Sequence, residues 1–177
     1  AALAIAWKGG GVALLALWAA VEARDADGWL LTAVMALGAL GDVLLEIAFT
    51  AGAVAFLAGH IVAIGLYQRN RPSRPMVIPH GLLWLLAPVV AGLAWSLPAD
   101  RAQAPGVAFY AFVLGAMAAA ALGSGFPRHR VGLGAILFVL SDLLIFARMG
   151  PLAGGTLARF GVWPLYYLGQ LLIAGGV

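Results

Sequence analysis

Seven runs of apolar residues follow one another along the chain, and most approach the roughly 20 residues that cross a bilayer as a helix. Proline, glycine or charged residues mark the breaks between the runs. We predict helices over residues 9–22, 29–49, 51–69, 77–97, 105–122, 131–149 and 160–176. The expected fold is therefore an all-α, polytopic bundle of transmembrane helices that forms a single domain over residues 1–177.

The apolar stub at residues 1–7 comes directly before Lys8 and three glycines. We interpret it as the end of a further helix whose start is missing, so that the intact protein would have eight helices. A cleaved signal peptide is the alternative interpretation, and it leaves the seven visible helices unchanged.

Composition places these helices in a membrane. Hydrophobic residues make up 64% of the chain and charged residues only 10%, too few polar groups to cover a water-soluble fold. The absence of cysteine excludes disulfide scaffolds, thiol nucleophiles and cysteine-ligated metals. The basic residues lie between the apolar runs, a pattern of membrane topology rather than of nucleic-acid binding. We expect membrane lipid as the surroundings, no nucleic-acid partner and no protein partner.

Basic residues in alternate breaks indicate the orientation. One side of the membrane holds six of them: Arg24, Arg69, Arg71, Arg74, Arg128 and Arg130. The other side holds four: Lys8, Arg101, Arg148 and Arg159. The positive-inside tendency puts the first side, and with it the C-terminus, in the cytoplasm. In a bacterium the protein would lie in the inner membrane.

A few polar side chains stand inside the predicted spans, where an ionised group costs about 2.5–3.5 kcal/mol at the helix centre and usually lines a functional cavity. Asp42 and Asp142 each lie seven residues from the non-cytoplasmic end of their predicted helix, and His60 and Gln170 lie slightly deeper. The same region also contains Ser141, Tyr166, Tyr167 and, at a shallower position, Glu46. Similar depths in four helices predict one buried polar cavity near the non-cytoplasmic face.

A weak internal repeat involves the same residues. Residues 41–45 (Gly-Asp-Val-Leu-Leu) parallel residues 141–145 (Ser-Asp-Leu-Leu-Ile). In the helix that follows each, residues 56–60 (Phe-Leu-Ala-Gly-His) parallel residues 166–170 (Tyr-Tyr-Leu-Gly-Gln). The two aspartate helices are four spans apart and should therefore run parallel, as in a duplication about an axis along the membrane normal. Chance similarity between apolar segments is the alternative.

Two carboxyl groups in a medium of low dielectric constant resist double ionisation, so the pair can supply a general acid and a general base side by side. Such a site needs neither a metal nor another cofactor, and we expect none. Structural roles stay open for the other residues: His60 as a packing histidine, Gln170 and the tyrosines as interhelical hydrogen-bond partners, and Glu46 as a solvated carboxylate.

Taken in order, these motifs resemble the YhhN-like lysoplasmalogenase family over nearly the whole chain. They are residues 41–45, Phe56-x-x-Gly59-His60, Gly134-x-x-x-Phe138-x-x-Ser141-Asp142 and Tyr166-Tyr167-x-x-Gln170. The resemblance implies about eight transmembrane helices and hydrolysis of the vinyl ether bond of a lysoplasmalogen, a single-chain lysophospholipid. The products would be a fatty aldehyde and glycerophosphocholine or glycerophosphoethanolamine. Asp42 and Asp142 correspond to the two family aspartates. Lys8 corresponds less closely, because the family has Lys-Pro where this chain has Lys8-Gly9, and Glu46 stands where relatives are expected to be apolar.

Two other functions compete with this one. Intramembrane carboxylates also mark the proton relays of transporters, so a proton-coupled transporter of a lipid or another small molecule is the main alternative. Leu40-Gly41-Asp42 also resembles, faintly, the Gly-Asp signature of aspartyl intramembrane proteases, but the rest of that pattern is absent.

Overall fold

The computed structural model of this chain describes the backbone of residues 2–73 and 78–177 and the side chains of residues 9–73 and 78–177. This part is helical, which confirms the predicted all-α class. Its long helices are α1 (Ala2–Glu22), α2 (Ala26–Leu45), α3 (Phe49–Arg69), α5 (Leu86–Ser96), α6 (Ala104–Leu122), α7 (Leu133–Ala147) and α8 (Thr156–Ala174). A short helix α4 (His80–Leu83), a 3₁₀ turn (Arg101–Gln103) and a π turn (Arg128–Gly132) complete it.

Four helical segments are long and apolar enough to cross a membrane, as expected of an integral membrane protein: Ala26–Leu45, Phe49–Arg69, Arg101–Leu122 and Arg128–Ala147. Large apolar side chains point outward from several helices, among them Leu14, Val54, Ile61, Phe109 and Leu133. An apolar exterior of this kind suits contact with lipid chains rather than with water.

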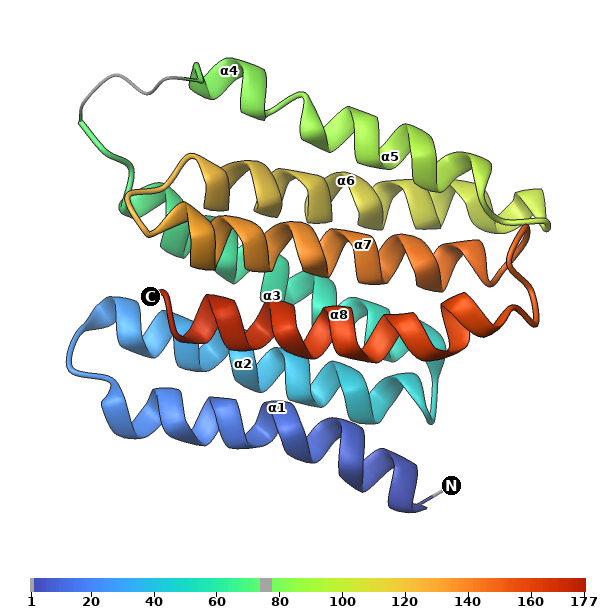
Figure 1. Ribbon diagram of the computed structural model, residues 1–177, viewed down its shortest axis with the longest axis horizontal. Coiled ribbons are helices and arrows are strands. Elements are labelled where there is room, and N and C mark those ends of the chain that lie inside the picture. The colour runs from blue at the N-terminus through green and yellow to red at the C-terminus, as the bar shows by residue number, and fades with distance from the viewer. Residues whose placement is uncertain (1, 74–77) are drawn as a thin grey trace.

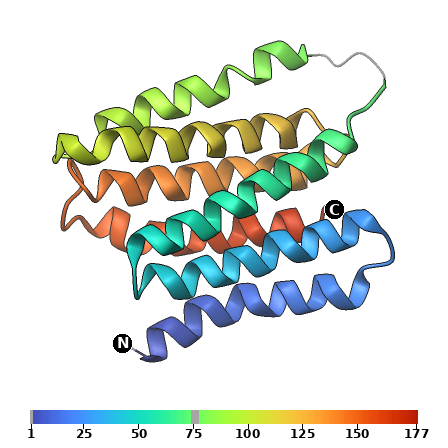
Figure 2. The ribbon, with the colours of Figure 1, turned by 180° about the vertical axis from the view of Figure 1, so that it is seen from behind.

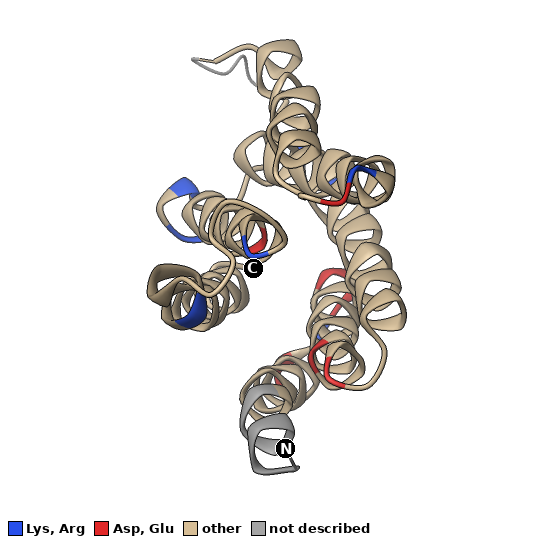
Figure 3. Ribbon diagram, turned by 90° about the vertical axis from the view of Figure 1, so that its right-hand side faces the viewer, with Lys and Arg blue, Asp and Glu red and all other residues tan. Residues whose placement is uncertain are grey.

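The long helices lie side by side in a flat bundle (Figures 1 and 2). Neighbouring contacts order five of them in a row, α1–α2–α3–α6–α5. Seen along the helices, this row is curved, and the α7–α8 pair lies inside the curve (Figure 3). There α7 contacts α5 and α6, whereas α8 contacts α1 and α2. The site described below lies between the row and the pair.

The connections alternate between the two ends of the bundle as the sequence predicts. The α1–α2 and α6–α7 connections, the end of α3 and the start of α4 share one end of the bundle with the C-terminus (Figure 1). At that end Arg69 Nε lies 2.8 Å from Asp27 Oδ1, and Asn70 Nδ2 donates to Asp27 Oδ2 at 2.8 Å. These contacts join the end of α3 to the start of α2. Arg74, one of the six basic residues that indicate the orientation, lies outside the described residues.

Residues 2–7 of the stub are not the end of a separate helix in this structure, so that part of the interpretation is wrong, and the count of eight helices stays a prediction. These residues continue into α1, and Lys8 lies inside the same helix. The glycines that suggested a break instead permit close packing. A Cβ at Gly9 would lie 2.8 Å from Val43 Cγ2, and one at Gly11 would lie 3.0 Å from a Tyr167 ring carbon. Small residues of this kind let membrane helices approach each other closely.

The turn between α2 and α3 comes earlier than predicted, at residues 46–48 rather than at Thr50. A Cβ at Gly52 would lie 2.6 Å from the backbone nitrogen of Leu45, so glycine allows the start of α3 to fold tightly against the end of α2. The start of α2 is also earlier, because Asp25 accepts hydrogen bonds from the backbone N–H groups of Asp27 and Gly28 as an N-cap. Asp42 therefore lies three residues before the last residue of α2, and Asp142 five before the last residue of α7, instead of seven.

The predicted helix over residues 77–97 is interrupted between α4 and α5. Pro88 has no N–H group for the carbonyl of Trp84, and its ring crowds that carbonyl. The Trp84 carbonyl accepts from Ala87 N at 3.2 Å instead, and the chain bends there. The last two helices also differ at their ends: α7 follows a π turn and ends at Ala147, and α8 begins at Thr156.

Two glycines bring α7 and α8 into backbone contact. A Cβ at Gly134 would lie 2.6 Å from the carbonyl oxygen of Gly169, and one at Gly169 would lie 2.8 Å from that of Gly134. The role of Gly169 is therefore to let α7 and α8 pack closely. This glycine lies next to Gln170 and one turn after Tyr166, so the close contact of α8 with α7 also positions the segment of α8 that carries these two side chains.

Candidate active site

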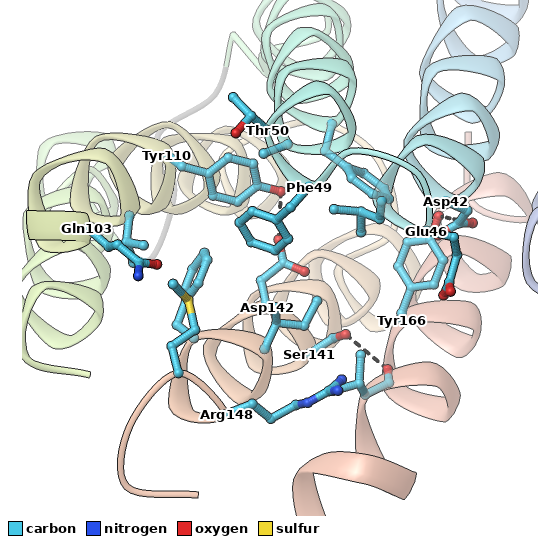
Figure 4. Close-up of a pocket in the computed structure, with 18 of the residues that line it drawn as sticks. Asp42, Glu46, Phe49, Thr50, Gln103, Tyr110, Ser141, Asp142, Arg148 and Tyr166 are labelled. Carbon is cyan, nitrogen blue, oxygen red and sulfur yellow. Dashed lines mark hydrogen bonds between the residues drawn. The ribbon is translucent and has the colours of Figure 1, made fainter. Parts of the chain in front are cut away.

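A cavity of about 890 Å³ lies between α2 and α3 on one side and α6, α7 and α8 on the others (Figure 4). Apolar side chains form much of its wall, including Phe49, Phe56, Phe146, Met149 and Trp163. Polar groups also line it: Asp42, Glu46, Gln103, Tyr110, Ser141, Asp142, Arg148, Arg159 and Tyr166. Both aspartates therefore line the same cavity, as the sequence predicts.

A tyrosine of α8 holds the Asp42 carboxylate in place. Asp42 Oδ2 accepts a hydrogen bond from the Tyr166 hydroxyl at 2.9 Å, and Gln170 Nε2 lies 3.5 Å from the same hydroxyl. Asp42, Tyr166 and Gln170 are all buried. Gly38 leaves the room they need, because a Cβ there would lie 2.9 Å from Gln170 Nε2 and 3.4 Å from the Tyr166 hydroxyl.

Tyr110 of α6 holds Asp142 in place, and His60 of α3 in turn contacts Tyr110. Asp142 Oδ2 accepts a hydrogen bond from the Tyr110 hydroxyl at 2.8 Å, and His60 Nε2 lies 3.0 Å from that hydroxyl. His60 and Asp142 are only 4% and 6% exposed, so protein rather than solvent surrounds both of them. His60 does not line the cavity but stands behind Tyr110.

Aromatic rings fill the space between the two sets of hydrogen bonds. Phe138 makes edge-to-face contacts with His60 at 5.0 Å and Tyr166 at 5.1 Å between ring centroids, and Phe56 lies 5.8 Å from Tyr166. Rings in this geometry attract each other weakly and exclude water. Phe56 fits because Gly41 faces it, where a Cβ would lie 2.7 Å from the ring.

The remaining predicted site residues have different surroundings. Ser141 lines the cavity, and its hydroxyl donates to the Val162 carbonyl at 2.9 Å, which joins α7 to α8. Glu46 lines the cavity directly after the end of α2. Tyr167 is not among the lining residues. It stacks on Trp163 with 5.0 Å between ring centroids and faces Gly11 of α1. The side chain of Lys8 lies outside the described residues.

Two arginines lie at the end of the cavity where α7 connects to α8. Arg148 follows the last residue of α7 directly, and Arg159 stands in the first turn of α8 with its guanidinium 5.5 Å from the Phe160 ring centroid. Both side chains are exposed and line the cavity. Cationic groups at one end of a cavity with apolar stretches of wall favour a ligand with a negatively charged head and an apolar body.

Tyr110 is the residue of this site that sequence reasoning missed. It stands in an apolar stretch of α6 and has no counterpart in the internal repeat. A phenol inside an apolar span is itself a signal, since a buried hydroxyl nearly always finds a hydrogen-bond partner.

Two carboxyl groups in one largely apolar cavity are suited to proton transfer, with one as acid and the other as base. Among the described residues, no group of three or more histidine, aspartate or glutamate side chains is arranged to hold a metal ion. Searches of curated proteins and of solved structures found no match. The sequence model of the YhhN family, in contrast, matches residues 3–177. The chain therefore belongs to the YhhN family.

Proposed function

We propose that this protein is a lysoplasmalogenase, which hydrolyses the vinyl ether bond of a single-chain ether phospholipid. The observation that carries the proposal is the pair of tyrosine-held aspartates, Asp42 and Asp142, that line one cavity inside a membrane bundle. Membership of the YhhN family is consistent with this activity.

The cavity matches the substrate in size and polarity. Its volume of about 890 Å³ lies within the usual range for small-molecule sites. The vinyl ether and the start of the chain would lie among Phe49, Phe146 and Met149, with the rest of the chain between helices. The phosphate would lie near Arg148 and Arg159, where a guanidinium can donate two hydrogen bonds to it.

Protonation of the vinyl ether at its β-carbon is the first chemical step. One aspartic acid gives its proton to this carbon while the double bond's electron pair forms the new C–H bond. The adjacent carbon becomes an oxocarbenium ion, which the partner aspartate stabilises as a negative charge. That carboxylate then removes a proton from water as the water oxygen bonds to the cationic carbon. The result is a hemiacetal, by the two-carboxylate logic of glycoside hydrolysis.

Collapse of the hemiacetal restores the starting protonation. The first aspartate, now ionised, takes the hydroxyl proton, and the second, now protonated, gives its proton to the ether oxygen. The C–O bond to glycerol breaks, which releases a fatty aldehyde and a glycerophospho alcohol. Each carboxyl therefore acts once as acid and once as base, and no external proton is needed.

Aldehyde release from a lysoplasmalogen by the purified protein in detergent micelles tests the proposal. Reduction of the aldehyde by an NADH-dependent alcohol dehydrogenase gives a continuous signal. The matched control is the Asp42→Asn/Asp142→Asn double variant, purified in the same way. A transporter would release no aldehyde but would move lipid or protons across proteoliposomes, and that result would overturn the proposal.

A further inference from the structure

The two aspartates stand at the ends of two similar hydrogen-bonded chains of side chains. The first runs from Gln170 through Tyr166 to Asp42, with distances of 3.5 and 2.9 Å. The second runs from His60 through Tyr110 to Asp142, with distances of 3.0 and 2.8 Å. In each chain a tyrosine hydroxyl connects the carboxylate to a long polar side chain behind it.

The two hydrogen-bonded chains also cross between two pairs of helices. Consecutive helices α2 and α3 carry Asp42 and His60, and consecutive helices α7 and α8 carry Asp142 and Gln170. Yet Gln170 acts on the aspartate of the first pair, and His60 on the aspartate of the second. His60 and Gln170 also end the two matching five-residue segments of the sequence, 56–60 and 166–170.

We propose that Tyr110 and His60 are positioning residues for Asp142, and that His60 acts as a hydrogen-bond donor and not as a proton carrier. The inference rests on the proposed function, because it assigns roles within the same reaction. Its main support is the equivalent place of Gln170, since a neutral amide donates a hydrogen bond but does not exchange protons as an acid or base near neutral pH.

The number of available protons determines which group donates each hydrogen bond in the second chain of side chains. A tyrosine hydroxyl has one proton, and Tyr110 gives it to Asp142 Oδ2. The Tyr110 oxygen can then only accept, so His60 must present Nε2–H to it. The hydrogen bond from Tyr110 makes Oδ2 the less basic of the two carboxylate oxygens, so Oδ1 is the oxygen that carries the transferable proton. His60 and Tyr110 thus determine which oxygen of Asp142 reacts.

Packing holds His60 in this role. Its ring contacts Tyr110 at 5.5 Å and Phe138 at 5.0 Å between centroids, both edge to face. A buried ring with this many aromatic neighbours has little freedom to rotate. The Tyr110 hydroxyl is therefore held toward Asp142 before substrate arrives, as catalytic preorganisation requires.

Substitutions at His60 and Tyr110 test whether His60 acts as a hydrogen-bond donor or as a proton carrier. His60→Gln keeps an N–H group near the position of Nε2 and should retain turnover within about threefold of wild type, whereas His60→Leu should lose about tenfold or more in kcat. Tyr110→Phe should lose a similar factor in kcat with little change in KM. The matched control is Tyr67→Phe, since Tyr67 is fully buried and its hydroxyl has no hydrogen-bond partner among the described residues. It should keep wild-type kcat.

An infrared measurement tests the same inference without relying on turnover. The carboxyl band of Asp142, assigned by its loss in Asp142→Asn, should shift in Tyr110→Phe and His60→Leu but stay in place in His60→Gln and Tyr67→Phe. If wild type releases no aldehyde, the proposed function fails, and the band shifts alone decide the positioning roles. Equal damage by His60→Gln and His60→Leu, or an unshifted band in Tyr110→Phe, would overturn the inference. Should His60→Gln not fold, the converse variant Gln170→His must retain turnover, and its loss would also overturn it.

Discussion

Replacing Gly38 by alanine should lower both stability and turnover, because the new methyl group would occupy the space that the Asp42 chain of hydrogen bonds needs. The added Cβ would lie 2.9 Å from Gln170 Nε2, 3.4 Å from the Tyr166 hydroxyl and 3.5 Å from Val12 Cγ1. Gln170 is 2% exposed, so the surrounding protein leaves its side chain no room for a small adjustment in place. The amide must therefore leave its place near Tyr166, whose hydroxyl holds Asp42.

The magnitude follows from two opposing effects. Overpacking a well-filled interior costs about 1–3 kcal/mol. Alanine in place of a helical glycine returns about 1 kcal/mol of helix propensity. The expected net loss is about 0–2 kcal/mol in the free energy of unfolding. Turnover should fall about tenfold, the factor that corresponds to a rise of 1.4 kcal/mol in the activation barrier.

Gly65→Ala is the matched control, since Gly65 also lies inside a helix but a Cβ there meets no atom within 4 Å. It should be as stable as wild type or slightly more so, with unchanged turnover. The difference between the two variants isolates the contact and should be about 1–3 kcal/mol. Denaturant unfolding in detergent and the aldehyde assay measure both effects. A Gly38→Ala protein as stable and as active as Gly65→Ala would refute the reasoning.

Three further outcomes are expected. Asp42→Asn and Asp142→Asn should each lower turnover about 10²- to 10⁴-fold while circular dichroism shows a folded protein, and retention of a tenth of the rate would exclude acid–base roles. A saturated alkyl-ether lysolipid should inhibit competitively in the aldehyde assay without turning over, because it has no double bond to protonate; its cleavage would indicate another reaction. Arg148→Gln and Arg159→Gln should each raise KM about 2- to 5-fold for the phospholipid, as exposed ion pairs are weak. Neither should change KM for an alkenyl glycerol without phosphate, and an equal rise for both substrates would argue against phosphate binding.

The helical class and the meeting of the two aspartates could be predicted because both follow from local sequence. Apolar runs of membrane length predict helices whatever their neighbours. Asp42 and Asp142 are expensive to place in lipid, so their depth in parallel helices predicted a shared cavity. The alternation of loops between the two ends followed from the order of the helices (Figure 1).

Helix ends and hydrogen-bond partners depend on tertiary packing instead. The glycines at positions 9–11 suggest a break in sequence, yet they lie inside α1, where Val43 and Tyr167 approach two of them too closely for a larger side chain. The early turn after Leu45 depends on Gly52 of the next helix. Tyr110 could not be assigned to Asp142, because α6 has no part in the repeat that linked the other polar residues.

Deuterium incorporation tests the central claim, proton transfer to carbon by a carboxyl pair, most directly. The purified protein is supplied with a lysoplasmalogen in D₂O, and the trapped aldehyde is analysed by mass spectrometry. The account predicts one deuterium on the carbon next to the aldehyde group, the former β-carbon of the vinyl ether. In H₂¹⁸O it predicts no label in the glycerophospho product, since water attacks the alkenyl carbon. An aldehyde without carbon-bound deuterium, or ¹⁸O in the glycerol product, would contradict it.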